Sequence, residues 1–81
     1  MLMVTLTEIP GKKLEPLGVV SGAERGNRPG VTISIAMEEM EEQAAALGAD
    51  AVIDVRIISH AVSESANSIH TVYGTAVKFV E

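Results

Sequence analysis

The sequence has no cysteine and no tryptophan, and it contains a single tyrosine and a single phenylalanine. Without cysteine, the chain cannot form a disulfide, bind a metal through thiolates or use a thiol as a nucleophile. This composition is compatible with a reducing compartment, and we expect a cytoplasmic protein. With aromatic residues at only 2%, the chain offers no platform on which nucleic-acid bases could stack.

Positive charge and long apolar runs are also scarce. Six Lys and Arg residues stand against eleven Asp and Glu residues, and the net charge of −5 opposes a phosphate-backbone partner. No apolar run approaches the ~20 residues that a membrane-spanning helix needs. The first residues, MLMVTLTE, lack the basic and apolar regions of a signal peptide. We therefore expect neither a nucleic-acid nor a membrane partner.

The chain is 81 residues long, so we expect residues 1–81 to form one small domain with an aliphatic core. The segment QAAALGADAVIDV at residues 43–55 organises this domain. Its first part favours the end of a helix, Gly48 supplies a residue that closes helices in the left-handed conformation, and β-branched residues follow. The pattern predicts a helix over Val31–Leu47 with a buried strand after it.

Four segments alternate between apolar and polar residues as strands do. We expect the first two to form a β-hairpin around Pro10-Gly11, with Pro16 at an edge or a bulge and Gly18 at a bulge or a close backbone approach. The Gly-rich residues Gly22–Gly30 are predicted to be a loop, and either Thr32 or Ser34 is expected to cap the helix. The predicted strands are Met1–Glu8, Leu14–Ser21, Ala51–Val62 and Ile69–Val80, with a polar turn over Ser63–Ser68.

The predicted fold is therefore α+β, a ββαββ subunit with one helix packed on a four-stranded sheet. The apolar stripe of the helix comprises Ile33, Met37, Met40, Ala44 and Leu47, widened by Ala36, and glutamates form the opposite face. Strands Ala51–Val62 and Ile69–Val80 carry aliphatic residues on both faces, whereas the chain supplies one covering helix. We expect a neighbouring subunit to cover the second face in a symmetric homo-oligomer.

Two histidines, His60 and His70, flank the turn between the last two predicted strands. If the paired positions of this hairpin sum to an even number, the two side chains share a face, and if the sum is odd they point apart. On one face, they could hold a borderline metal ion with Asp54 or Glu64 as a further ligand. The simpler alternative is a pair of exposed or interfacial histidines, because no recognised ligand spacing is present.

Charged residues elsewhere allow two further hypotheses. Arg25 and Arg28 lie in the Gly-rich segment and could collect a small oxyanion, although a solvated loop is the simpler interpretation. Asp54 and Arg56 are two positions apart on one strand face, which is compatible with a charge pair in a pore. We favour an ion pair across a subunit boundary.

No sequence pattern assembles a nucleophile with its base. The chain has no phosphate-binding loop and no dinucleotide-binding glycine pattern. We therefore expect a protein that is not an enzyme. Met3, Met37 and Met40 are expected to fill the core rather than to act as thioether ligands.

Three segments occur in an order typical of one family: LGVVSG at residues 17–22, ALGADAV at residues 46–52 and YGTAVK at residues 73–78. Together they resemble the YbjQ-like family of small bacterial and archaeal proteins, for which heavy-metal binding has been suggested. The resemblance implies a single YbjQ-like domain over residues 1–81 and a homopentamer of ββαββ subunits. The short segment Gly22–Gly30 departs from longer family members.

The family includes a small archaeal selenium-binding protein thought to hold selenium through a lone cysteine near the end of the third strand. In this chain Ser59 or Ser63 lies in that region, so the thiol chemistry does not carry over. The resemblance implies an oligomeric binding or carrier protein for a metal ion or a selenium or oxyanion species. The alternative is an interaction or scaffold ring without a small-molecule ligand. The candidate ligand residues are Ser59, His60, His70 and Arg56, and the candidate metal ligands are His60, His70 and Asp54.

Overall fold

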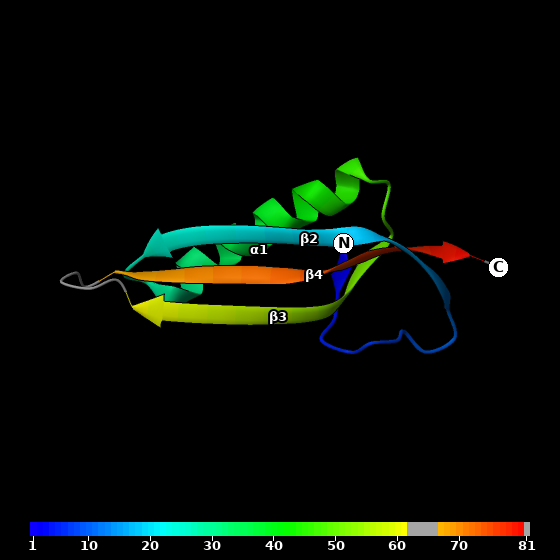
Figure 1. Cartoon of the computed structure of the whole chain (residues 1–81), viewed down its shortest axis with the longest axis horizontal. Coiled ribbons are helices and arrows are strands. Elements are labelled where there is room, and N and C mark those ends of the chain that lie inside the picture. Colours follow the sequence, from blue (N-terminus) through cyan, green and yellow to red (C-terminus); the bar gives the residue numbers. More distant parts are fainter. Residues whose placement is uncertain (62–66, 81) are drawn as a thin grey trace.

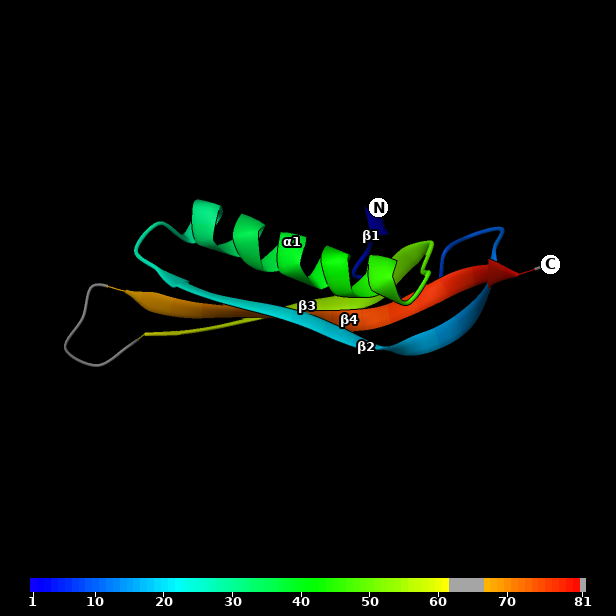
Figure 2. The ribbon, with the colours of Figure 1, turned by 90° about the horizontal axis from the view of Figure 1, so that it is seen from above.

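A computed structural model of the chain describes residues 1–61 and 67–80. One helix packs against one face of a four-stranded sheet, as Figure 2 shows, and the predicted α+β class and ββαββ order are confirmed. The described helix is not long and apolar enough to cross a membrane. The elements are β1 (Leu2–Met3), β2 (Lys13–Gly26), α1 (Pro29–Ala46), β3 (Ala51–Ala61) and β4 (Ser68–Val80) (Figure 1).

The sheet has the strand order β1-β3-β4-β2, so β3 and β4 are the inner strands and the first two strands lie at opposite edges. The predicted hairpin of Met1–Glu8 with Leu14–Ser21 is therefore wrong. β2 instead pairs antiparallel with the whole of β4, and β1 pairs parallel with the start of β3. Alternation identified the strands but not their partners, because a half-buried strand reads the same whichever neighbour it has.

The predicted loop Gly22–Gly30 is also wrong, because β2 continues to Gly26 and α1 begins at Pro29. Gly22 lies beneath the helix, where a Cβ atom would stand 1.9 Å from the Ala36 carbonyl oxygen. This glycine is therefore needed for close packing of helix on sheet rather than for a turn. Pro29 occupies the first helical turn, where its missing N–H has no intrahelical partner to lose.

Neither predicted helix cap is used, since Arg28 is the N-cap residue and makes no side-chain cap hydrogen bond. The Ser34 hydroxyl instead donates to the Gly30 carbonyl at 2.9 Å, one turn back within the helix. The predicted helix end is confirmed to within one residue: α1 ends at Ala46, and Gly48 follows with a positive φ of 77°.

Two bulges shape the long strands. The register of β2 shifts between Pro16 and Gly18, which confirms the predicted bulge at an edge strand. The register of β3 shifts between Ile53 and Arg56, around Asp54 with its positive φ of 57°. One extra residue there exchanges the two faces, so the uninterrupted alternation predicted for Ala51–Val62 is wrong beyond Ile53.

The core lies between the helix and one sheet face and is built from aliphatic and small side chains. Ala36, Met40 and Ala44 of α1 are fully buried, Ile33 and Met37 are half-buried, and Leu47 of the predicted stripe is 48% exposed. The sheet contributes Val20, Val52, Val55, Val72 and Ala76.

The other sheet face is only partly covered by the chain itself. Ala51 and Val77 pair with one another, and strand alternation places both side chains on the face away from the helix. Both are nevertheless buried. Residues 7–12 line a cavity of about 530 Å³ together with Ile53, Thr75 and Val77. Beyond this cavity the face is open: Val19, Ile58 and Tyr73 are 77%, 52% and 37% exposed.

Candidate functional site

Ser59 and His70 stand directly opposite one another on β3 and β4. The Ser59 hydroxyl oxygen lies 2.6 Å from Nδ1 of His70. His70 alternates with Val72 and Ala76 of the core, so its ring lies on the helix side of the sheet, and it is only 4% exposed. Ser59 itself is exposed, so the pair joins a buried imidazole to solvent.

The Nε2 atom of His70 is an exception to the rule that buried polar atoms have hydrogen-bond partners. Nε2 is buried and has no hydrogen-bond partner among the described residues. Because Ser59 holds Nδ1 on the β3 side, the geometry of the ring turns Nε2 away from β3. If Ser59 donates to Nδ1, Nε2 carries the proton and is a donor. If Nδ1 carries the proton, Nε2 offers a lone pair.

His60 lies on the opposite face from His70. It pairs with Ile69, the neighbour of His70 along β4, so the paired positions sum to an odd number. The structure therefore resolves the alternative that the sequence left open, and the predicted metal set of His60, His70 and Asp54 is not brought together within one chain. Residues 1–61 and 67–80 contain no group of three His, Asp or Glu side chains that could hold a metal ion. Ser63 and Glu64 lie outside the described residues.

Two glutamates contact one another on the helix side of the sheet, the side on which His70 lies. Glu24 on β2 pairs with His70 on β4 in the strand register, and Glu39 of α1 contacts the Glu24 side chain. A hydrogen bond with Glu39, together with the repulsion between the two charges, raises the pKa of the Glu24 carboxyl above its ordinary value. The contact between Glu24 and Glu39 therefore links strand β2 to helix α1 on the same side of the sheet as His70.

Side chains of α1 also cover part of the edge strand β2. The Ser21 N–H donates to the Gln43 side-chain oxygen at 3.1 Å, and the Ala23 N–H donates to Glu39 Oε2 at 3.3 Å. On an edge strand, every second N–H group points away from the sheet, as those of Ser21 and Ala23 do. Glu39 and Gln43 lie one helical turn apart on the same face of α1, so each can accept from one of these groups. These contacts occupy donors that would otherwise be open to another strand.

We predict that the Glu24–Glu39 pair makes stability depend on pH. A carboxyl whose pKa is raised by folding stabilises the folded state below its ordinary pKa, and this contribution is lost as pH rises through the raised value. Glu24→Gln keeps a donor to Glu39 without needing the proton, so it should remove this loss. Urea unfolding from pH 4 to pH 7 should show a smaller decline for Glu24→Gln than for wild type. Glu38→Gln, on the exposed helix face, should retain the wild-type decline.

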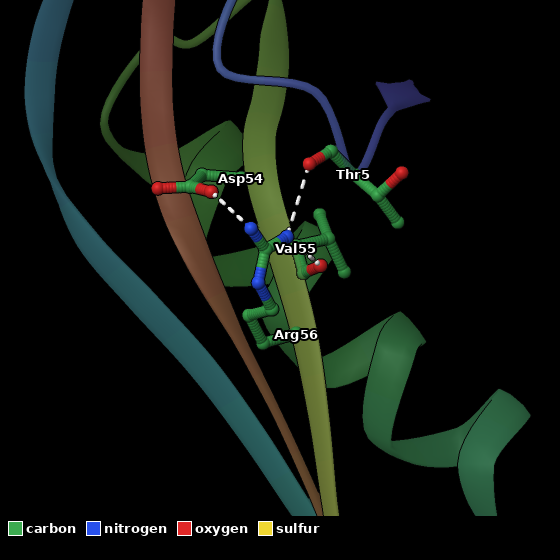
Figure 3. A network of polar contacts seen from close by, with 4 residues as sticks. All are labelled: Thr5, Asp54, Val55 and Arg56. Atoms are coloured by element: carbon green, nitrogen blue, oxygen red, sulfur yellow. Dashed lines mark hydrogen bonds and ion pairs between the residues drawn. The ribbon is translucent and has the colours of Figure 1, made fainter.

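Arg56 and Asp54 form an ion pair within the chain, which Figure 3 shows in close-up. Arg56 Nη2 lies 2.9 Å from Asp54 Oδ1, and Arg56 Nη1 donates to the Thr5 carbonyl oxygen at 3.0 Å. The Asp54 N–H donates to the Leu6 carbonyl at 2.8 Å. The expected ion pair across a subunit boundary is therefore wrong for this pair, which fastens the N-terminal segment to the bulge of β3.

The remaining candidate ligand residues are also separated from His70. Arg56 pairs with Tyr73 and so lies on the same outer face as His60. Arg25 belongs to β2 on that outer face, and Arg28 is the helix N-cap residue, so no Gly-rich cradle for an oxyanion forms. Of the predicted ligand residues Ser59, His60, His70 and Arg56, only Ser59 and His70 meet.

Sequence reasoning missed three features: the cavity at residues 7–12, the Glu24–Glu39 pair and the fastening of Thr5. Each joins segments far apart in the chain. No local pattern marks such pairs, although Glu24 opposite His70 would follow from the correct strand pairing.

Comparisons with known proteins agree with this fold. A relative named UPF0145 protein from Limosilactobacillus fermentum is 33% identical over 105 aligned residues, covering all of this chain and 93% of the relative. A UPF0145 protein from Alkaliphilus metalliredigens is 51% identical over 47 residues, covering 58% of this chain and 45% of that protein.

A crystal structure of a protein of unknown function of the DUF74 family, from Pediococcus pentosaceus, superposes with a TM-score of 0.88. It covers 99% of this chain and 98% of its own, at 15% identity, and shows the fold alone. The sequence profile of the YbjQ family, described as "putative heavy-metal-binding", matches residues 31–80. This match and the full-length relative show that the chain belongs to the YbjQ family.

Proposed function

We propose that this chain is a subunit of a small cytoplasmic homo-oligomer that binds a metal ion or a small oxyanion at the Ser59–His70 pair. The observation that carries the proposal is the buried Nε2 of His70, which has no partner in residues 1–61 and 67–80, while Ser59 lies 2.6 Å from Nδ1 of the same ring. A second-sphere partner of this kind fixes the tautomer and orientation of a ligating histidine. The family description supports the same direction.

The surroundings of His70 favour a cation over an anion. Glu24 and Glu39 lie on the same side of the sheet, and the net charge of the chain is −5. The negative charge of these carboxylates would attract a divalent cation and repel an oxyanion. Since one chain offers no group of three ligands among its described residues, the remaining ligands in this proposal are water molecules or groups from another subunit.

Titration calorimetry with Zn²⁺ tests the proposal. We expect His70→Ala to weaken zinc binding by at least about tenfold, and Ser59→Ala to weaken it by roughly tenfold, as loss of an orienting partner does. His60→Ala is the matched control, because His60 lies on the opposite face and should leave the zinc affinity unchanged. Equal losses for His60→Ala and His70→Ala would contradict the proposal.

Selenite provides the second arm of the test. The anionic alternative predicts selenite binding by wild type and its loss in His70→Ala. If only Ser59→Cys takes up selenium, in the presence of a thiol and near one atom per subunit, the chain is a carrier scaffold without its reactive residue. Elemental mass spectrometry of the purified proteins measures these contents.

The second candidate function is an interaction ring without a small-molecule ligand. It is favoured by the lack of a three-ligand group in the described residues and by the exposed glutamates of α1. We propose no catalytic role, because no third side chain in the described part of the chain meets Nε2 of His70 to complete a nucleophile–base–orienter arrangement with Ser59. Zinc and selenite titrations without heat change would favour the ring.

A further inference from the structure

The cavity beside residues 7–12 lies on the face of the sheet away from the helix and measures about 530 Å³. Its floor is formed by Ile53 of β3 and by Thr75 and Val77 of β4, the two inner strands. Val77 is only 1% exposed, and its neighbour Ala76 belongs to the core on the helix side. Pockets that bind small molecules measure roughly 300–1,000 Å³, so the cavity has the size of a ligand site.

The wall of the cavity is the segment that joins β1 to β2 (Figure 1), and it is fixed at both ends. At one end, the Asp54 N–H donates to the Leu6 carbonyl oxygen at 2.8 Å. At the other end, the Lys12 N–H donates to the Ile9 carbonyl oxygen at 3.1 Å and closes a turn. Gly11 has a positive φ of 77° within it, as the third residue of a type II turn requires. The cavity is therefore pre-formed.

The lining of the cavity favours an aliphatic ligand. Its side chains without a polar atom are Ile9, Pro10, Leu14, Pro16, Ile53 and Val77. Thr7 and Thr75 add hydroxyl groups, and none of the described lining residues is aromatic. A water molecule occupies ~30 Å³ of liquid, and a methylene group is of similar size, so the cavity has room for roughly 15 non-hydrogen atoms.

Two charged side chains of opposite sign also line the cavity, Glu8 and Lys12, one on each side of the turn. Both are exposed, and neither forms an ion pair with another residue of the ranges 1–61 and 67–80. Lys12 Nζ lies 5.2 Å from the centroid of the Phe79 ring, a contact that holds the ammonium group at the rim. Contact with a ring face leaves ammonium N–H groups available to an anion. The rim therefore offers both an acceptor and a donor.

We infer that the cavity binds a free α-amino acid with an aliphatic side chain of about the size of leucine. An anionic head alone would be attracted by Lys12 but repelled by Glu8, and a cationic head alone would meet the reverse. A zwitterion gives each of these side chains a partner of opposite charge, while its aliphatic part covers the apolar floor. The α-ammonium group therefore faces Glu8, and the α-carboxylate faces Lys12.

This site goes beyond the proposed function and does not depend on it. The cavity shares no residue with the Ser59–His70 pair, and strand alternation places His70 on the helix side of the sheet. His70→Ala should therefore leave the affinity for the amino acid unchanged, and a bound amino acid should leave the zinc affinity of wild type unchanged. Loss of either ligand in wild type thus contradicts one proposal and not the other.

Titration of the isotope-labelled protein with L-leucine, followed by NMR, locates the site. We expect the amide signals of Gly11, Thr75 and Val77 to shift, and those of Ser59 and His70 to keep their positions. L-Alanine has the same head but lacks most of the aliphatic part, so it should bind at least about tenfold more weakly. Shifts confined to residues outside the cavity, or no shift with L-leucine at tens of millimolar, would overturn the inference.

Two analogues of leucine separate the contributions of its two charges. Isocaproate lacks the ammonium group and isoamylamine lacks the carboxylate, while both keep the branched aliphatic chain. We expect each analogue to bind roughly tenfold more weakly than L-leucine, because each leaves one charged side chain of the cavity without a partner. An analogue that binds as tightly as L-leucine would show that the site takes a singly charged ligand, and would overturn the zwitterion.

Exchanging the charged side chains assigns each head group to its partner. Glu8→Gln should weaken L-leucine binding roughly tenfold without weakening isocaproate, and Lys12→Gln should weaken L-leucine equally without weakening isoamylamine. Glu15→Gln and Lys78→Gln are the matched controls, since these exposed residues pair with one another on the other face of the sheet. Circular dichroism checks that each variant folds. Losses in the two controls as large as those in the cavity variants would contradict the site.

Discussion

Gly22→Ala should destabilise the protein by at least about 3 kcal/mol, because an added methyl group would overlap the helix backbone. The Cβ position at Gly22 is 1.9 Å from the Ala36 carbonyl oxygen and 3.0 Å from Glu39 Cβ. A backbone atom cannot turn aside as a flexible side chain does, so α1 must move away from β2. That movement would also disturb the Ala23–Glu39 hydrogen bond.

Gly30→Ala is the matched control, since it adds the same methyl group within the same helix–strand unit. Nothing lies within 4 Å of the Cβ position at Gly30. Alanine is the better helix former, so Gly30→Ala should stabilise by up to about 1 kcal/mol.

Thermal melting at one fixed protein concentration compares the two variants. A domain of this size should lose roughly 15 °C or more in Tm for Gly22→Ala. Equal Tm values for the two variants would show that the helix does not rest on β2 as the structure has it.

The sequence was sufficient to locate the helix and most of the strands, but not to predict which strands pair with one another. Alternation located most of β2, β3 and β4, and Gly48 located the helix end, because these signals are local. The position of β1 beside β3 depends on hydrogen bonds such as that from the Val4 N–H to the Val52 carbonyl at 2.9 Å. Such a contact between distant segments leaves no mark on either segment alone.

Glycine composition misled the prediction at Gly22–Gly30. Gly22 and Gly26 look like loop residues, yet both lie in β2, where side chains would meet α1. Composition records that a side chain is absent but not whether the absence serves a turn or a close approach. Which of the two applies depends on tertiary contacts.

The candidate site shows the same limit at finer scale. The rule relating register to His60 and His70 was available from the sequence, but the register itself required the pairing of His60 with Ile69. The bulge at Asp54 then placed Ser59, rather than Ile58, opposite His70 and turned His60 to the other face. A single inserted residue thus determines which side chains form the site.

Met40→Ala is the second large effect that we expect, a loss of about 2–5 kcal/mol. Met40 is the largest fully buried side chain of the described residues. Its helical neighbours in the core, Ala36 and Ala44, are small. No aromatic residue lies in the core cluster that could close around a cavity. The site must therefore keep most of the volume that the truncation removes.

Met37→Ala is its control, because it makes the same truncation one helical turn away at a position that is only half-buried. We expect it to cost about 1 kcal/mol. Chemical denaturation gives both values, and hydrogen exchange of the β2 amides reports whether the helix still covers the sheet. Because the helix side chains of Glu39 and Gln43 hold the Ala23 and Ser21 N–H groups, Met40→Ala should speed exchange at these two amides more than Met37→Ala does. Similar losses for both variants would place the main support of the helix outside the Met40 contact.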